Sequence, residues 1–547
     1  MRKFNEKFFR FPFLLAFRNS FSPLSRLYQG ISGILFVFFC SLILCEPVSA
    51  KTLFWQYYEP VGNPNPASDG TDASIVFSNM IHDALIGYDE NGEAIPWLAE
   101  EIHSNEDFTQ WTFKLHDNAH FSDGTPIHAD AVLYTINFYK NSSVLAGTYA
   151  LIGKAEAEDD LTVTVDLTAP EKDFLYQDPI YILSPSCGSY GCDYRQPNMP
   201  VSGAWYVSEY TPAYHAVLKK NDGYWMSGFP KFDQVDYLFS EDGLKMMDAV
   251  KEGERDFAPL VPAAAARYEN ADGVRLIRIT EQDSYEGFAF NLAVPPFNTK
   301  EVRTALKMLT NPEEMSEMCW NGYAENTGGD YLLSEEKSSS SSDLSPEERI
   351  RKTREQLASS GWTDQDGDGI LESHGVAGLA DNTKFSFPLA YESDRSDAEC
   401  HAVLMAGWAK QAGIDLIPTP DSRRTFYADT AAGKYPIWEY RHALSTHPLT
   451  AFFKQFDSAG SAVGYGTHVS DAQLDQMIGN ALQLTDEDQR REQISGINDY
   501  LASQQILIAD TAPLNGWLLN SQMIHFYASP LSLMGTRSII LADISGR

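Results

Sequence analysis

The hydrophobic pattern alternates between strand-like and helix-like segments from residue 51 onward. Residues 161–167 place apolar side chains at every second position, which is typical of a half-buried strand. Residues 52–58, 216–218 and 235–239 are rich in β-branched and aromatic residues and are also expected to form strands. Between residues 302 and 309 the apolar positions follow the spacing of one helix face. This interleaving predicts a mixed α/β fold.

Local signals place one further helix and one loop. Ser345-Pro346-Glu347-Glu348 combines a capping box with proline at the first helical position, and Gly361 is expected to close the helix that follows. The five serines at 338–342 predict a surface loop just before it.

The first fifty residues have the pattern of a targeting segment. Six Lys and Arg residues precede position 27, an uncharged apolar run occupies 33–44, and small residues follow at 48 and 50. The run is shorter than the roughly 20 apolar residues of a membrane span. We predict a cleaved secretory signal over residues 1–50 and a periplasmic protein. A retained anchor is the alternative, and a lipoprotein anchor at Cys45 is disfavoured by the bulky Leu44.

Length and charge narrow the class of protein. The chain has 547 residues, 43% of them hydrophobic, which predicts two or three globular units. Its formal charge is −34, and the first fifty residues hold six basic and two acidic residues, so the remainder carries −38. Such a surface repels polyanions, and binding to nucleic acid is not expected.

Four cysteines follow the predicted signal. Cys187 and Cys192 flank a turn-rich segment and are predicted to form a disulfide in an oxidising compartment, with free thiols or a metal site as alternatives. Cys319 and Cys400 could also pair, but the sequence does not decide this.

Catalytic signatures are absent from the sequence. It has no His-Glu-x-x-His, no nucleophile elbow, no phosphate-binding loop and no dinucleotide fingerprint. Residues 364–369 begin like a calcium loop, but Gly375 stands at position twelve, where a glutamate is required. We interpret the segment as a carboxylate-rich turn, with a weak calcium site as the alternative. An enzyme, a cofactor and a resident metal are not expected.

Several short motifs follow one another in a distinctive order. The first is Pro96-Trp97-Leu98-Ala99-Glu100, and the second spans residues 111–132. The others lie, in order, at residues 202–206, 221–225, 252–256, 291–306 and 361–369. Each is weak alone, but their order over nearly the whole chain after residue 51 resembles the peptide/nickel family of extracellular solute-binding proteins.

The resemblance implies a two-lobed periplasmic-binding-protein clamp of class II, with α/β lobes, an extra subdomain in the first lobe and two hinge crossings. On this basis residues 51–285 form lobe I, with an inserted subdomain at about 86–200. Residues 286–513 form lobe II, and residues 514–547 return to lobe I. The crossings are expected near Tyr285 and Pro513.

The resemblance also identifies a ligand loop at residues 438–448. Peptide-binding members carry an acidic residue there, but residues 443–446 contain no carboxylate. Arg441 offers a bidentate partner for an anionic ligand, and the two histidines offer hydrogen bonds or metal coordination. The expected ligand-binding residues are Arg441, His442, His447, Tyr440, Trp438, Trp517, Tyr57 and Tyr58. Solvated charges and core aromatics are the alternative interpretation.

The predicted function is therefore that of an exported solute-binding protein. It would capture a peptide-like or other small solute between its lobes and deliver it to the permease of an ABC transporter, acting as a monomer. The alternatives are a ligand-binding sensor or adaptor, and a binding protein for metal chelates of the nickel or metallophore type.

Overall fold

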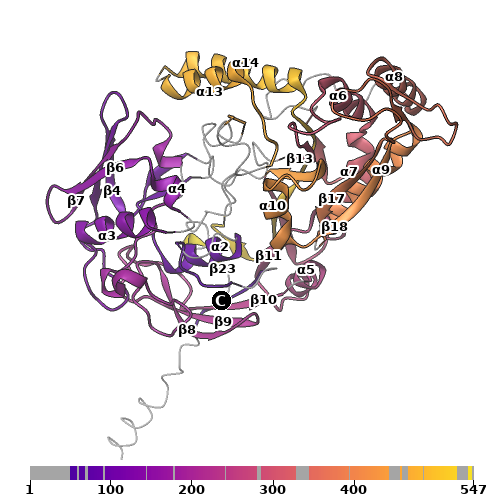
Figure 1. Cartoon of the computed structure of the whole chain (residues 1–547). Helices are drawn as coiled ribbons and strands as arrows, with labels where there is room; N and C mark the ends of the chain where they lie inside the picture. The colour runs from indigo at the N-terminus through magenta and orange to yellow at the C-terminus, as the bar shows by residue number, and fades with distance from the viewer. Residues whose placement is uncertain are drawn as a thin grey trace, which may run out of the picture. The chain divides into compact units, whose positions relative to one another are not determined.

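The computed structural model divides the chain into two units, Met1–Ala50 and Lys51–Arg547. The second unit contains the described helices and strands (Figure 1). The predicted signal segment and the five-serine tract lie outside the described residues. The described residues are 50–57, 61–67, 72–89, 93–142, 145–176, 179–240, 242–279, 285–327, 344–393, 395–442, 456–458, 466–484, 486–526 and 540–544.

A seven-stranded sheet, as far as the structure describes it, forms around the first strand of the second unit. Its order is β12-β21-β11-β1-β10-β9-β8, and β1 runs parallel to β10 and β11 in the middle. The strands are β1 (Thr52–Tyr57), β8 (Trp205–Thr211), β9 (His215–Lys220), β10 (Gln234–Phe239), β11 (Phe257–Pro259), β12 (Val274–Ile279) and β21 (Asn515–Asn520). The strands expected at 216–218 and 235–239 are confirmed, as is the strand expected from residue 52.

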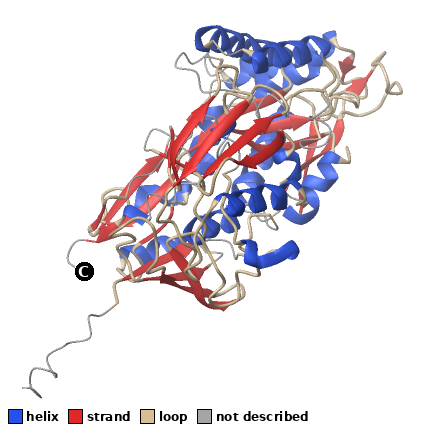
Figure 2. Cartoon of the chain, turned by 90° about the vertical axis from the view of Figure 1, so that its left-hand side faces the viewer, coloured by secondary structure: helices blue, strands red, loops and turns tan. Residues whose placement is uncertain are grey.

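A second, antiparallel sheet shares a hydrophobic core with the first. Its order is β4-β5-β7-β6, and Figure 2 views the molecule from this side. Every second residue of β7 is buried, as the alternating sequence predicts. Trp55 of the first sheet and Phe113 and Val163 of the second belong to one core. The strands are β4 (Ala99–Ser104), β5 (Gln110–Leu115), β6 (Ile152–Ala157) and β7 (Thr162–Leu167).

Short elements complete this half of the molecule. Helix α3 packs against β6 and β7, and α5 packs against β11 and β21. The helices are α2 (Asp72–Ile81), α3 (Ala129–Lys140), α4 (Ala146–Tyr149) and α5 (Gly243–Lys251), with 3-10 turns η2 (Phe174–Tyr176), η3 (Pro185–Tyr190) and η4 (Pro262–Arg267). Two small ladders pair β2 (Ile86–Tyr88) with β3 (Ala94–Pro96), and β22 (Met523–Ile524) with β23 (Asp543–Ile544).

A six-stranded sheet organises the middle of the chain. Its order among the described strands is β14-β20-β13-β19-β17-β18. Every residue of β13 and β20 is buried, because these strands lie inside the sheet and helices cover both of its faces. The strands are β13 (Tyr285–Phe290), β14 (Ala324–Asn326), β17 (Ser386–Glu392), β18 (Asp415–Asp421), β19 (Ile437–His442) and β20 (Leu507–Pro513).

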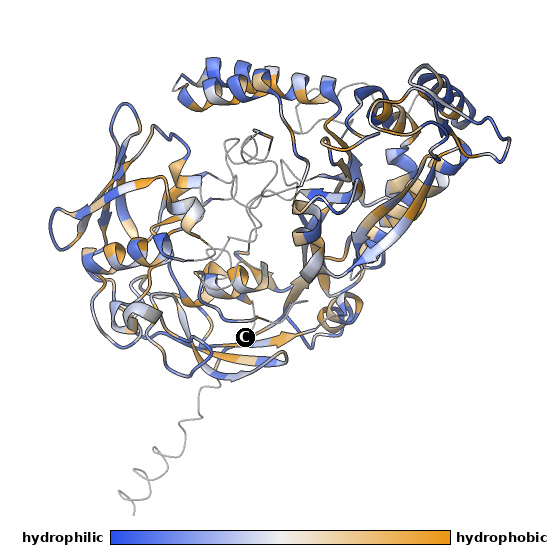
Figure 3. Ribbon diagram, viewed as in Figure 1, coloured by the Kyte–Doolittle hydropathy of each residue, from blue (hydrophilic) through white to orange (hydrophobic). Residues whose placement is uncertain are grey.

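Two helix layers bury the two faces of this sheet. The first core contains Phe288, Phe290 and apolar residues of α6 (Lys300–Leu309), α7 (Pro312–Trp320), α8 (Pro346–Ser359) and α9 (Ser396–Gln411). The second contains Tyr285, Trp438 and residues of α10 (Arg423–Ala431), α13 (Ala472–Gln483) and α14 (Glu487–Gln504). The predicted capping box at Ser345 is confirmed, and Figure 3 shows that most residues of α8 are hydrophilic.

The chain changes from one large sheet to the other at two places. Residues 280–284 separate β12 of the seven-stranded sheet from β13 of the six-stranded sheet. Leu514 alone separates β20 from β21, which belong to different sheets. Both changes lie next to the positions predicted for the crossings, Tyr285 and Pro513.

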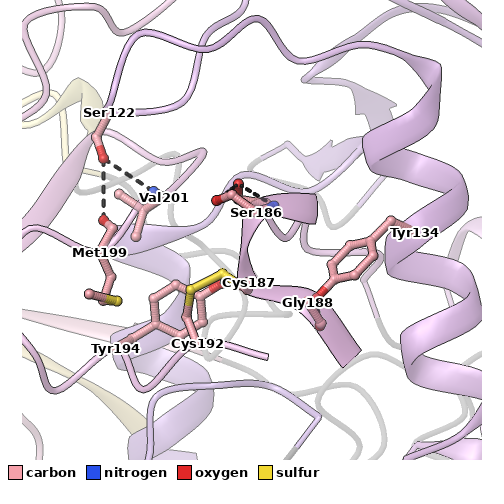
Figure 4. The surroundings of a disulfide bond; sticks show 10 residues. Ser122, Tyr134, Ser186, Cys187, Gly188, Cys192, Tyr194, Met199 and Val201 are labelled. Atoms are coloured by element: carbon pink, nitrogen blue, oxygen red, sulfur yellow. Dashed lines mark hydrogen bonds between the residues drawn. A yellow bond between two sulfur atoms is a disulfide. The ribbon is translucent and has the colours of Figure 1, made fainter. Parts of the chain in front are cut away.

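Two disulfides link the four cysteines of the second unit. Cys187 pairs with Cys192, as predicted, and Cys319 of α7 pairs with Cys400 of α9. The Cys187–Cys192 loop lies against α3, where the Tyr134 hydroxyl donates a hydrogen bond of 2.7 Å to the Gly188 carbonyl (Figure 4).

None of the described helices combines the length and the apolar character that crossing a membrane requires.

Candidate functional site

The predicted ligand loop begins on β19, which pairs with β13 in the six-stranded sheet. The antiparallel register places Arg441 opposite Glu286 and Glu439 opposite Phe288. Directly opposed residues share a face and alternate residues return to it. Glu286, Glu439 and Arg441 therefore project from the same face, toward α9.

Arg395 links the two glutamates from the start of α9. Its guanidinium nitrogens lie 3.0 Å from Glu286 Oε1 and 3.3 Å from Glu439 Oε2, and a third contact joins it to Asp397. Both glutamates are essentially inaccessible to solvent, at 0% and 1% side-chain exposure. Buried charges at this depth require partners, and Arg395 contacts more than one carboxylate at once.

His401 lies further along α9 in the same cluster. Its Nδ1 is 3.5 Å from Glu439 Oε1 and 3.7 Å from Glu286 Oε2, and neither ring nitrogen makes a hydrogen bond to a described residue. Burial acts to lower the pKa of His401, but the negative charges of Glu439 and Glu286 outweigh it and raise the pKa. The pKa of Glu286 is raised to about 7 by burial, and Arg395 opposes that shift. The net charge of this cluster therefore depends on the protonation of His401 and Glu286.

Arg441 forms the outer edge of the cluster. Its side chain is 38% exposed, and its Nε lies 3.4 Å from Glu286 Oε1. The Arg441 guanidinium thus contacts the buried Glu286 carboxylate, while part of the Arg441 side chain is accessible to solvent. A positioned, partly exposed guanidinium is suited to bind a carboxylate in the fork geometry of arginine.

The aromatic residues of β19 lie on the opposite face from Arg441. Trp438 and Tyr440 are 2% and 6% exposed and belong to the core beneath α13 and α14. Tyr440 packs against Tyr285, with ring centroids 6.0 Å apart. Trp438 and Tyr440 therefore lie on the strand that carries Arg441, but they pack in the core on its other face.

Other predicted ligand residues lie elsewhere. Tyr57 and Trp517 belong to the seven-stranded sheet, where both are buried and Trp517 packs 6.3 Å from Trp55. Tyr58 and His447 lie outside the described residues. His442 ends β19, but its side chain also lies outside the described part of the structure.

A second buried ion pair connects the two cores. Arg490 of α14 donates to Asp173, which precedes η2, over 2.8 Å from Nη1 to Oδ1 and through a second contact from Nη2 to Oδ2. The side chains are 9% and 12% exposed. Asp173 adjoins Phe174 in the core of the seven-stranded sheet, whereas α14 packs on the six-stranded sheet. The pair therefore joins segments that belong to different sheets.

Sequence reasoning missed both ion clusters. Glu286, Arg395 and Glu439 lie more than 40 residues from one another, so no local motif contains them. The available signal was a single glutamate inside each of two otherwise apolar or aromatic strands, at 285–290 and 437–440. A charge within a buried strand requires a partner from another element.

Comparison with known proteins gives these features a family context. Residues 93–463, more than half of the chain, match the family model described as "Bacterial extracellular solute-binding proteins, family 5 Middle". The chain belongs to this family. It is therefore a family 5 solute-binding protein and not an enzyme.

Individual relatives agree with the family assignment. The glutathione-binding protein GsiB of Pectobacterium atrosepticum is 24% identical over 480 residues, which cover 83% of this chain and 88% of that protein. The oligopeptide-binding protein AppA of Bacillus subtilis, solved with a nonapeptide, has a TM-score of 0.74 at 21% identity, covering 90% and 99% of the two chains. NikA of Brucella suis, solved with Fe(III)-EDTA, has a TM-score of 0.76 at 20% identity, covering 88% and 98%. These family 5 structures share the two-lobed fold with this chain.

Proposed function

We propose that this family 5 protein is an exported receptor that captures a peptide-like or other small solute between two lobes and delivers it to an ABC-transporter permease. The lobes would comprise residues 51–285, 286–513 and the returning 514–547, behind a signal segment at 1–50. In this proposal the protein acts as a monomer in the periplasm. The family assignment and the names of its relatives, which bind glutathione or oligopeptides, support the solute class.

The observation that carries the site assignment is the position of Arg441. Glu286 holds its Nε from the buried side, and the rest of the side chain is partly exposed. We infer that the outer guanidinium nitrogens bind an anionic group of the solute, such as a carboxylate. Because Glu286, itself held by Arg395, contacts the Arg441 guanidinium before the solute arrives, binding would cost less side-chain entropy than it would for a mobile arginine.

The ion pair between Asp173 and Arg490 suggests how capture could be coupled to closure. We propose that this pair forms when the two lobes approach and that it breaks when they separate. A solute shifts such an equilibrium only through its higher affinity for the closed form. The buried pair would then lower the free energy of the closed form. Binding of the solute would supply the rest of the free energy that closure requires.

The first experiment identifies the solute. The protein purified from an exporting host is analysed by native mass spectrometry and again after denaturation. A ladder of small masses indicates peptides, which would then need an amine partner other than a carboxylate at residues 443–446. One discrete mass with a metal isotope pattern indicates a chelate and favours roles for His442 and His447. If the protein retains no small molecule and no solute class raises its unfolding midpoint, the receptor proposal is wrong.

The second experiment tests the arginine with the recovered solute. Arg441→Ala is compared with Arg491→Ala, an exposed arginine on α14 whose side chain is 71% accessible. A charged hydrogen bond contributes about 1.5–3 kcal/mol, so Arg441→Ala is expected to weaken binding by about tenfold or more. Arg491→Ala is expected to change affinity by less than about twofold. A change below about twofold in Arg441→Ala would mean that the solute binds elsewhere.

A further inference from the structure

A loop between two short strands gathers four carboxylates outside the proposed solute site. The strands are β15 (Trp362–Thr363) and β16 (Glu372–Ser373), and they pair antiparallel. One carboxylate oxygen from each of four residues lies within 4.8 Å of the others. The four residues are Asp364, Asp366, Asp368 and Glu372. Such clusters are common on acidic surfaces, so the group needs independent support.

Glu372 provides that support, because it is buried and incompletely satisfied. The residue is 4% exposed. Its Oε2 accepts a hydrogen bond of 3.0 Å from the Gln365 amide, but its Oε1 accepts none from a described residue. A buried carboxylate oxygen without a donor loses its hydration and gains nothing in return. A bound cation would supply the missing interaction.

The spacing of the loop matches calcium coordination up to its ninth position. Asp364, Asp366 and Asp368 stand at positions one, three and five of a calcium loop, and Ile370 offers its carbonyl at position seven. Gly369 stands at position six, where the loop must turn sharply, and its φ is +93°. Glu372 stands at position nine. The ladder explains why an acid there can replace the absent one at position twelve, because Glu372 pairs with Thr363, the residue before the first aspartate.

The charge of the cluster is only partly balanced. Lys384 contacts Asp368 and lies 3.6 Å from Asp366, so one ammonium faces four carboxylates. Its side chain is 47% exposed and can rotate into solvent. A divalent cation would therefore displace a mobile counter-ion rather than a buried one.

We propose that residues 364–372 form a calcium site, with carboxylate oxygens of the three aspartates and Glu372 and the Ile370 carbonyl as ligands and water completing the shell. Calcium accepts six to eight oxygen ligands in irregular geometry, which suits a loop of this kind better than the strict octahedron of magnesium. The same loop is anchored to the end of α9, because the Leu371 amide donates 2.8 Å to the Gly413 carbonyl. Calcium would therefore stabilise the loop and its junction with α9.

The test uses terbium(III), which accepts the same oxygen ligands and emits when a nearby tryptophan is excited. Trp362 precedes Asp364 by two residues. The full exported protein is freed of divalent ions with EDTA and titrated with terbium, and the bound terbium is then displaced with calcium or magnesium. Calcium is expected to displace it with an apparent dissociation constant on the order of 0.1–1 mM, the range of extracellular calcium modules. Magnesium is expected to require at least about tenfold more.

Variants separate this site from the general acidity of the surface. Asp366→Asn and Glu372→Gln are each expected to weaken terbium binding by about tenfold or more, whereas the exposed control Asp488→Asn changes it by less than about twofold. Lys384→Met is expected to strengthen binding severalfold, because the competing ammonium is gone. If Asp366→Asn, which alters an exposed side chain and so preserves the fold, binds like the parent protein, the site does not exist. Equal displacement by magnesium and calcium would also overturn the calcium assignment.

Discussion

Removal of the Arg395 guanidinium should destabilise the protein strongly, and the loss should depend on pH. Arg395→Met preserves the length and apolar stem of the side chain but leaves Glu286 and Glu439 without their main counter-charge. Breaking a buried ion pair by removing one partner costs about 3–5 kcal/mol, because an uncompensated charge remains in the interior. The loss is expected to be larger at pH 8 than at pH 5, because more of the Glu286 carboxyl is ionised at the higher pH.

The sign of the pH dependence follows from the raised pKa values. The pKa of Glu286 is about 7 in the folded protein, and Arg395 holds it below the value that burial alone would give. A group with a raised folded pKa stabilises the protein below its unfolded pKa, and this contribution is lost as the pH rises through the folded pKa. In the variant this pKa rises further, so a proton neutralises Glu286 at pH 5. Protonation there costs less than about 1 kcal/mol, since the ordinary glutamate pKa is about 4.3.

Among the neighbouring groups, His401 acts in the same direction. The side chains facing Arg395 and Glu286 from the packed elements are Glu392, Asp397, Glu439, His401 and Arg441. The raised pKa of His401 makes it a cation at pH 5, where it partly replaces the missing arginine. The loss of unfolding free energy caused by Arg395→Met at pH 5 is therefore expected to be less than half of the loss at pH 8.

The assay is urea unfolding followed by tryptophan fluorescence at both pH values, with midpoints compared at constant slope. Arg351→Met is the control, because Arg351 forms an exposed pair with Glu355 on α8 and its loss should change the free energy of unfolding by about 0.5 kcal/mol or less. Equal losses of unfolding free energy caused by Arg395→Met at pH 5 and pH 8 would refute the reasoning. A loss below about 1 kcal/mol at pH 8 would also refute it.

Two further predictions concern covalent and ionic links. Replacing Cys319 and Cys400 by serine should cost about 4.5 kcal/mol, because the bridge closes a loop with a sequence separation of 81. The loss of the other disulfide, with a separation of 5, should cost about 2 kcal/mol, and the unfolding midpoints of the two double variants test this order. Asp173→Asn should weaken binding of the recovered solute by about tenfold or more, because Arg490 loses its hydrogen-bonded carboxylate in the closed form. Calorimetry beside the surface control Asp488→Asn measures the difference. Equal affinities in the two variants would show that the ion pair does not contribute to closure.

The sequence predicted those elements whose information is local. The alternation of residues 161–167 shows which side of β7 faces the core. The capping box at Ser345 supplies hydrogen bonds to backbone amides within the same turn. Family motifs then supplied the two-lobed fold. In contrast, Arg395 and Glu286 are 109 residues apart, and only the pairing of β13 with β19 beneath α9 brings their charges together. Likewise, Trp438 and Arg441 lie on opposite faces of β19 because side chains alternate along a strand, but the sequence did not show what covers each face.

The beginning of the second unit has a consequence for maturation. The Lys51 amide donates 2.9 Å to Asp233 Oδ2, and the Lys51 ammonium contacts Asp543 near the end of the chain. Cleavage after Ala50, as the sequence predicts, would convert that amide into a charged α-amino group. The existing hydrogen bond would become charge-assisted, and such bonds are about twice as strong as neutral ones. Processing would thus leave a new chain end already docked on a carboxylate, a product better protected from aminopeptidases than a loose terminus.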